Sequence, residues 1–205
     1  SVSSFPDSTT VTAHEDPDPR FGMASPVTDT FSMTTGTITS NISTDRTAVL
    51  SDPSNMLSLE TLTESMDVNG NVFSRVYDAT TGIWTSTTPM GRQRFTQTDV
   101  VGRVISDQIS GLEPVSYSYD SYGRIESVSQ GTGPEARTFA LTYDAVGNID
   151  TVTDPLGRVT NLDCDGEGRV TAANYHDGRV ISYAYDLDGN LTHVCPPGKP
   201  CHEFS

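Results

Sequence analysis

The sequence has few basic residues and no long apolar run. Lys and Arg number 12 against 27 Asp and Glu, which gives the 205-residue chain a formal net charge of −15. This charge repels phosphate backbones and anionic lipid headgroups, so nucleic acid is not an expected partner. No stretch of about 18 consecutive apolar residues is present, so no membrane span is expected.

Apolar side chains are also scarce, at 34% hydrophobic and 8% aromatic residues. Core positions must therefore be spread along many short elements. No window keeps the apolar spacing of an amphipathic helix over three turns, and the best candidate, residues 55–65, is rich in Ser and Thr. The sequence favours small strands with one buried face. The absence of an initiator Met predicts a piece cut from a longer protein, and since an export signal could have been lost with the rest, its absence says nothing about the compartment.

Three cysteines are too few for a disulfide framework. Cys195 and Cys201 flank a Pro-rich turn that can bring their sulfur atoms together. They are our candidates for a disulfide, which would indicate an oxidising compartment. Zinc would need two further ligands, and since only His193 and His202 are close, no metal site is expected.

The dominant feature is a repeat of the form Tyr-Asp-x-x-Gly-Arg/Asn-aliphatic. Its glycines recur every 21 residues, with a second unit ten or eleven residues on, so one period spans two strands. One longer step is absorbed by residues 130–135, which are rich in turn formers. The structural repeat positions are Tyr119, Asp120, Gly123, Tyr143, Asp144, Gly147, Asp154, Gly157, Asp165, Gly168, Tyr175, Gly178, Tyr185, Asp186 and Gly189.

Each unit predicts a hairpin turn. Apolar residues alternate before the turn, as in Phe139-x-Leu141-x-Tyr143, which is typical of a strand buried on one face. The Asp can form an Asx-turn and the Gly supplies positive φ. We expect the following Arg or Asn to start the return strand on the solvent side. The aliphatic residue after it points inward to the Tyr ring.

Two of the departures from this pattern involve Cys and His, which could carry chemistry. Cys164 occupies a Tyr position, where we expect a small core residue, and His176 falls at the Asp position of a shortened unit. The repeat explains its carboxylates as turn residues, so they are not expected to be catalytic acids. No nucleophile motif accompanies the histidines, and the acidic turns lack the full calcium-loop pattern. We expect no catalytic residue, no metal and no cofactor.

Residues 1–65 are interpreted as a degenerate N-terminal β portion of the same sheet, and residues 66–205 as the repeat region. Strands are expected at residues 34–39 and 47–50, and a stiff acidic loop at residues 15–22. No clear linker separates the two portions. The predicted fold class is all-β, a spiralling antiparallel sheet with about 21 residues per two-strand repeat.

The repeat units resemble the YD repeats of RHS proteins, a group that includes the shells of bacterial Tc toxin complexes and the teneurin barrel. The resemblance is strongest in residues 143–149, 153–159 and 185–191, and it extends to residues 16–23 and 49–53. It implies a hollow β-shell, found outside the cell or at the cell surface, that encloses a cargo in toxins and supports adhesion in teneurins. Such shells are far longer than 205 residues.

A short spiral would leave open sheet edges, which need covering. Three hypotheses follow. The chain is a non-catalytic shell segment continued by further YD segments, a filament subunit covered by identical copies, or a glycan-binding module. For carbohydrate binding, the candidate aromatic residues are Trp84 and Tyr122.

Overall fold

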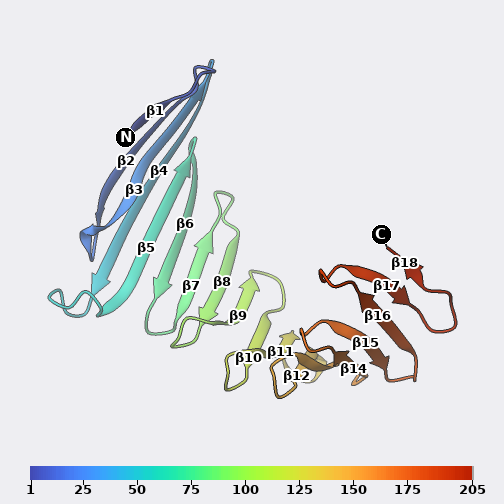
Figure 1. The fold of residues 1–205 in the computed structure, drawn as a ribbon. Coiled ribbons are helices and arrows are strands. Elements are labelled where there is room, and N and C mark those ends of the chain that lie inside the picture. Colours follow the sequence, from blue (N-terminus) through green and yellow to red (C-terminus); the bar gives the residue numbers. More distant parts are fainter. Residues whose placement is uncertain (205) are drawn as a thin grey trace. The chain divides into compact units, whose positions relative to one another are not determined.

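The structure is a computed structural model that describes residues 1–204. The all-β antiparallel prediction is confirmed. Within the described residues there is no α-helix, and only the 3-10 turn η1 (Gly133–Glu135) interrupts the strands. The chain divides into two compact units, Ser1–Pro114 and Val115–Ser205. Each is an antiparallel meander, with consecutive strands paired (Figure 1).

The first unit contains the longest strands. Figure 1 shows them as the blue and cyan arrows at the N-terminal side of the chain. The strands are β1 (Val2–Ser4), β2 (Thr10–Asp18), β3 (Gly22–Thr35), β4 (Ile38–Leu50), β5 (Leu59–Val68), β6 (Asn71–Asp78), β7 (Ile83–Thr87), β8 (Gln93–Thr98) and β9 (Val104–Ile109).

The second unit is built from shorter strands. They are β10 (Val115–Tyr119), β11 (Ile125–Gln130), β12 (Arg137–Tyr143), β13 (Ile149–Thr153), β14 (Val159–Cys164), β15 (Val170–Tyr175), β16 (Val180–Tyr185), β17 (Leu191–Cys195) and β18 (His202–Glu203). Because the strands alternate in direction, successive turns lie at opposite ends of the sheet. The turns after β10, β12, β14 and β16 share one end, which explains the 21-residue period.

Two local predictions for the N-terminal portion are wrong. Residues 15–22 are not a loop, because β2 continues to Asp18. Pro17 is tolerated there because β1 pairs only with Thr10–Thr12, so nothing requires a donor on the outer side of Pro17. Residues 34–39 are not one strand, because Gly36 takes a φ of 60° and turns β3 into β4. The expected boundary at residue 65 falls inside β5.

The two faces of the long strands differ in chemistry. Register pairing places a mixed apolar and charged set on one face, here called the Arg46 face, while Thr and Ser predominate opposite. The Arg46 face comprises Thr44, Arg46, Ala48, Leu62, Glu64, Met66, Phe73, Arg75, Tyr77, Trp84 and Ser86.

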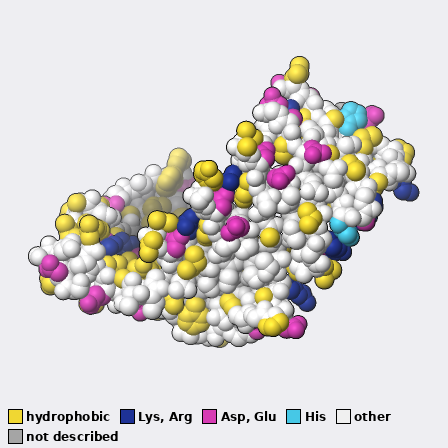
Figure 2. Space-filling model, turned by 90° about the horizontal axis from the view of Figure 1, so that it is seen from below, with side chains coloured by type: hydrophobic (Ala, Val, Ile, Leu, Met, Phe, Trp, Pro, Cys, Tyr) yellow, Lys and Arg dark blue, Asp and Glu magenta, His cyan; other side chains and the backbone are white. Residues whose placement is uncertain are grey.

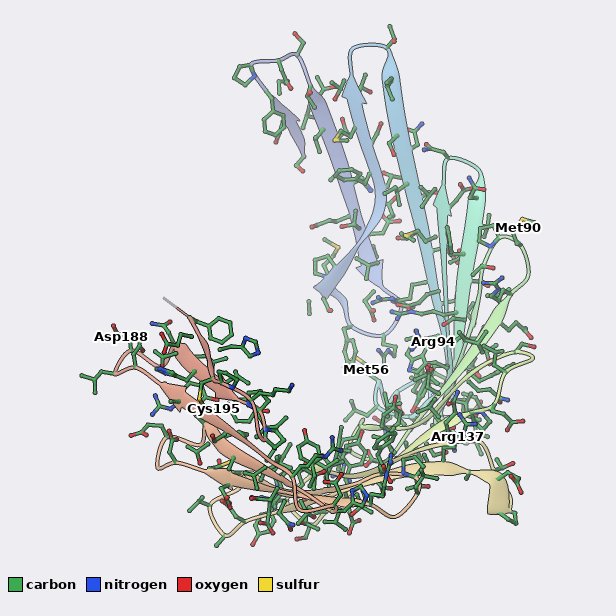
Figure 3. All side chains as sticks on the ribbon, turned by 90° about the vertical axis from the view of Figure 1, so that its right-hand side faces the viewer. Met56, Met90, Arg94, Arg137, Asp188 and Cys195 are labelled. Carbon is green, nitrogen blue, oxygen red and sulfur yellow. A yellow bond between two sulfur atoms is a disulfide. The ribbon has the colours of Figure 1, made fainter. Side chains whose placement is uncertain are left out.

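Burial is limited throughout. Among the described residues, Leu62 and Ala173 are the only buried apolar side chains, and Asp18 is the only buried charged one. The visible surface in Figure 2 accordingly carries many separate apolar side chains between polar groups. Met90, at the tip between β7 and β8, points away from the strands (Figure 3). With so small a core, hydrogen bonds and charge pairs must contribute much of the stability of the fold.

Candidate functional site

The recurring turn is organised by one aspartate. In the β12–β13 turn, the Asp144 Oδ1 atom accepts hydrogen bonds from the backbone N–H groups of Val146 and Asn148, at 3.0 and 2.9 Å. The Asp144 N–H donates to the Asn148 carbonyl at 2.9 Å. One carboxylate oxygen therefore holds the loop closed, as the sequence predicts for an Asx-turn.

The same arrangement recurs in both units. In every case the first carboxylate oxygen accepts backbone N–H bonds from the residues two and four positions later. The aspartates that repeat this geometry are Asp99, Asp120, Asp154, Asp165 and Asp186.

The residue after the turn glycine binds the second carboxylate oxygen. Arg124 Nε donates to Asp120 Oδ2 at 2.7 Å, and Asn148 Nδ2 donates to Asp144 Oδ2 at 3.1 Å. The side chain that we expected only to start the return strand therefore also closes the turn, by folding back onto its carboxylate. A guanidinium or amide folds back because the free carboxylate oxygen offers a charged acceptor at close range.

Hydrogen bonding keeps the turn carboxylates ionised. Desolvation alone would raise the pKa of Asp144, but the N–H groups of Asn148 and Gly147 outweigh it and the pKa is lowered. The Arg169 side chain, followed by its backbone N–H, lowers the pKa of Asp165. These carboxylates are acceptors already in use, which leaves little capacity for proton transfer.

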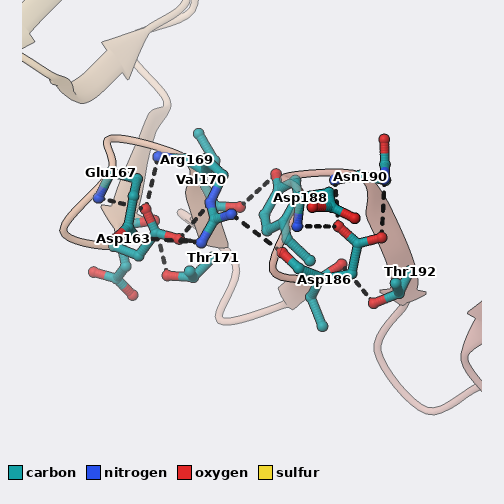
Figure 4. A network of polar contacts seen from close by, with 12 residues as sticks. Asp163, Glu167, Arg169, Val170, Thr171, Asp186, Asp188, Asn190 and Thr192 are labelled. Atoms are coloured by element: carbon teal, nitrogen blue, oxygen red, sulfur yellow. Dashed lines mark hydrogen bonds and ion pairs between the residues drawn. The ribbon is translucent and has the colours of Figure 1, made fainter.

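One end of the sheet in the second unit has a β-bulge at each turn. The register shifts just before Tyr119, Tyr143, Cys164 and Tyr185, so one extra residue follows on the return strand. In two turns that extra residue is a threonine whose hydroxyl bonds across the pair, from Thr171 to the Asp163 carbonyl at 3.1 Å and from Thr192 to the Ala184 carbonyl at 3.0 Å (Figure 4).

The turns at the opposite end lack the bulge, and one corrects our alignment. The Tyr175 N–H donates to the Arg179 carbonyl at 2.8 Å, as the Asp154 N–H does to the Arg158 carbonyl at 3.0 Å. Tyr175, and not His176, therefore occupies the Asp position, and the unit is not shortened. Its carboxylate comes instead from Asp177, whose Oδ2 accepts from Arg179 Nε at 2.7 Å.

Neighbouring turns at the bulged end contact each other. The Arg124 guanidinium lies 4.1 Å from the Tyr143 ring centroid, and the Tyr143 hydroxyl donates to the Ile125 carbonyl at 2.7 Å. Arg169 lies 5.0 Å from the Tyr185 ring centroid in the same way (Figure 4). Sequence reasoning missed these contacts, although the 21-residue period was the signal that places such turns side by side.

Comparison with known proteins identifies this architecture. The family model for the teneurin YD-shell matches residues 7–205. The chain belongs to the teneurin YD-shell family. This membership confirms the resemblance inferred from the repeat, and the family is one of structural shells.

Solved structures share the YD-shell fold at low sequence identity. A crystal structure of TcdB2-TccC3-TEV matches 100% of this chain and 12% of its own, with a TM-score of 0.60 and 11% identity. A crystal structure of TcdB2-TccC3-Cdc42 matches 95% of this chain and 11% of its own, with a TM-score of 0.58 and 11% identity. The chain thus spans about a tenth of the solved chains it matches, and these likenesses concern the fold alone.

The first unit of this YD-shell chain holds an ion network on the Arg46 face. Arg46 Nη1 lies 2.9 Å from Asp18 Oδ2, and Arg46 Nη2 lies 2.6 Å from Glu64 Oε1. Arg75 also binds Glu64 and stacks over the Trp84 ring at 4.7 Å. The network borders a hollow of about 590 Å³ across β3–β7.

Two aromatic residues were proposed for carbohydrate binding, and they differ in access. Trp84 is half-buried, with the Tyr77 ring at 5.0 Å and the Arg75 guanidinium on its face. Tyr122 is 83% exposed and borders a hollow of about 560 Å³ with Arg124 and Tyr143. The Arg124 guanidinium lies 5.0 Å from the Tyr122 ring centroid, so one face of this ring is partly covered, but Tyr122 is still the more accessible of the two aromatic residues.

The cysteines occupy two different settings. Cys195 and Cys201 form a disulfide across the β17–β18 turn, while Cys164 is free and half-buried at its Tyr position. Burial, followed by the charge of Asp144, raises the pKa of the Cys164 thiol. The thiol is therefore poorly activated.

One His and Asp cluster was missed by sequence reasoning. The ligand atoms of His14, Asp16 and Asp29 lie within 4.8 Å of one another, and His14 Nδ1 is 2.7 Å from Asp29 Oδ1. A bulge at His14 brings them together, which residue spacing does not reveal. The cluster is largely exposed and hydrogen-bonded within itself.

No helix within residues 1–204 has the length and apolar character needed to cross a membrane.

Proposed function

We propose that this chain is a non-catalytic segment of a YD shell, continued by further YD segments, that encloses or presents a cargo. The observation that carries the proposal is the use of the turn carboxylates. Asp144 and its counterparts bind their own backbone and the following Arg or Asn, so the acidic repeat builds turns and offers no paired acid and base.

The long strands of the first unit support a wall with two different sides. The Arg46 face carries aromatic, aliphatic and paired ionic groups, and on the opposite face Thr and Ser predominate. Two chemically different faces suit a wall that separates an enclosed space from the outside. The Cys195–Cys201 disulfide supports an extracellular or cell-surface location.

The proposal can be tested at the edge of the sheet formed by β2, which a shell segment needs to have covered. The outer side of β2 is paired by β1 only over Thr10–Thr12, so more of this edge becomes available when β1 is displaced. We expect Ser3→Pro, which disrupts β1, to increase association in sedimentation velocity and to yield curved, discrete particles by negative-stain microscopy. The matched control is Ser121→Pro, because Pro89 and Pro155 occupy the same turn position.

Each outcome of this experiment decides between the hypotheses. A stable monomer that melts cooperatively and ignores Ser3→Pro contradicts a segment that needs its edges covered. Filaments in place of discrete particles indicate that identical copies cover the edges. The net charge of −15 argues against filaments at low salt, since like-charged copies repel.

A glycan-binding role is the second candidate, and the exposed Tyr122 ring favours it. Sugar rings stack on accessible aromatic faces, and the neighbouring hollow gives room for one. A glycan array should show binding that Tyr122→Ala abolishes, while Trp84→Phe leaves it intact. Binding that survives Tyr122→Ala contradicts this site.

A further inference from the structure

The turns at the bulged end of the second unit contact their neighbours in two distinct ways. Where the residue after the turn glycine is Arg, the next turn on that end begins with Tyr. Arg124 precedes Tyr143, and Arg169 precedes Tyr185. Where it is Asn, as at Asn148, the next turn begins with Cys164.

The two Arg and Tyr pairs share a geometry that uses both ends of the ring. The guanidinium lies over the ring face, and the ring hydroxyl donates to the carbonyl of the residue after the Arg. These hydroxyl bonds run from Tyr143 to Ile125 at 2.7 Å and from Tyr185 to Val170 at 2.9 Å. This arrangement requires a planar cation to stack on the ring and a ring with a terminal hydroxyl to donate the hydrogen bond.

At Asn148 the close approach to the next turn is made to that turn's glycine, Gly168. Asn148 Nδ2 is held by Asp144, and a Cβ placed on Gly168 would lie only 2.8 Å from Asn148 Oδ1. Gly168, with a φ of 81°, therefore accepts the short amide directly against its backbone. An amide cannot cover a ring face as a guanidinium does, so a small residue at position 164 suits it.

We propose that these two positions form a pairing code between neighbouring turns, Arg with Tyr and Asn with a small residue, which fixes the order and register of turns along the sheet. Arg124, Arg169 and Asn148 are then positioning residues for the next turn as well as closing groups for their own. The code concerns how the wall is assembled and does not depend on what the wall encloses.

The decisive test introduces an Arg and Tyr pair at positions 148 and 164, where the chain has Asn and Cys. Asn148→Arg and Cys164→Tyr together should create a third Arg and Tyr pair, whereas each substitution alone creates a mismatch. We expect the double variant to have a folding equilibrium constant about two- to five-fold above the value that the single variants predict by addition. The readout is chemical unfolding, with hydrogen exchange at residues 149–170.

The reverse exchange is a second measurement if the new pair fails to fold. Arg124→Asn keeps its own turn closed, as Asn148 does, and Tyr143→Cys copies Cys164. The two losses should be less than additive, because the second removes a contact already lost. Arg158→Asn is the matched control, since Arg158 closes its turn with Asp154 at the opposite end.

The outcomes separate the code from a general effect of Arg or Tyr. Arg158→Asn should combine additively with Tyr143→Cys. Additive behaviour of both Arg124 with Tyr143 and the new pair overturns the proposal. So does a single Asn148→Arg variant as stable as the double one. A failure of the shell function leaves these couplings unchanged, so the two proposals fail independently.

Discussion

The long strands of the first unit and the short strands of the second are stabilised at different places. From β2 to β6 the strands have 8 to 14 residues, and their charge pairs, such as Arg46 with Glu64, lie across the middle of the sheet. From β10 to β17 they have 5 to 7 residues, and the charge pairs lie in the turns. Where the strands are short, the stabilising charge pairs lie in the turns and not on the strand faces.

Acidification should separate the two regions most strongly. The pKa values of Asp144 and Asp165 lie below the ordinary value of 3.8, so their stabilisation is complete above that value and is lost as the pH falls through the folded pKa. The pKa is lowered in the same way at Asp120, Asp154, Asp177 and Asp186 of the second unit, whereas in the β2–β6 strands it is lowered at Asp18 and Asp29. Because more such carboxylates lie in the second unit, it should lose protection in hydrogen exchange below about pH 4 before the β2–β6 region does. Trp84 fluorescence reports the first unit, and its change at a higher pH than the second-unit exchange would contradict this order.

Truncation of Leu62 should have the next largest effect, confined to the first unit. Leu62 is 7% exposed, with Ala48 and Tyr77 opposite it on the neighbouring strands. Leu62→Ala should lower the free energy of unfolding by about 2–3 kcal/mol, at the lower end for buried leucines because a single sheet relaxes easily. Urea unfolding followed by Trp84 fluorescence measures it.

The control for Leu62 is a residue on the opposite face. Val49, 54% exposed, also loses methyl groups in Val49→Ala but leaves no cavity, and should change stability by less than about 0.5 kcal/mol. Equal effects of the two substitutions would show that the Arg46 face has no local core.

The sequence predicted the repeat region well because its information is local. Asp and Gly positions set the turns around Asp144 and Asp165, and alternation sets the strands, so both follow from neighbouring residues. The contact from Arg124 to Tyr143 was not predicted, since it joins residues 19 positions apart. The role of Tyr175 was missed because a Tyr is normally the first residue of the unit, and only the turn hydrogen bonds show its position.

The N-terminal region was predicted less well because its interactions span many residues. The partners Asp18, Arg46 and Glu64 come from three strands, and no motif links them. A Pro and several acidic residues normally indicate a loop, yet β2 accommodates them through bulges and an unpaired outer side. Tertiary pairing overrides local preference at such positions.

Neutralisation of Asp18 tests whether the central ion network matters to the long strands. Asp18 is 3% exposed and accepts hydrogen bonds from Arg46 and from the backbone of Arg20 and Phe21. Asp18→Asn keeps an acceptor for the backbone but removes the charge facing Arg46, at a cost of about 1–2 kcal/mol. Asp45→Asn, one residue from Arg46 on the exposed side, removes the same charge and should be nearly neutral. Equal effects would mean that only net charge counts.

Reduction of the disulfide should have the smallest and most local effect. β18 has two paired residues, His202 and Glu203, and the Cys195–Cys201 bond closes the turn that holds them against β17. A dithiol reductant, itself oxidised to a disulfide, should convert both cysteines to thiols and release β18. Hydrogen exchange should then accelerate at β17 and β18, with no change in the β10–β15 turns, because loop closure is the main constraint on so short a strand. Unchanged exchange at β17 and β18 after complete reduction would show that backbone pairing alone retains β18 against β17.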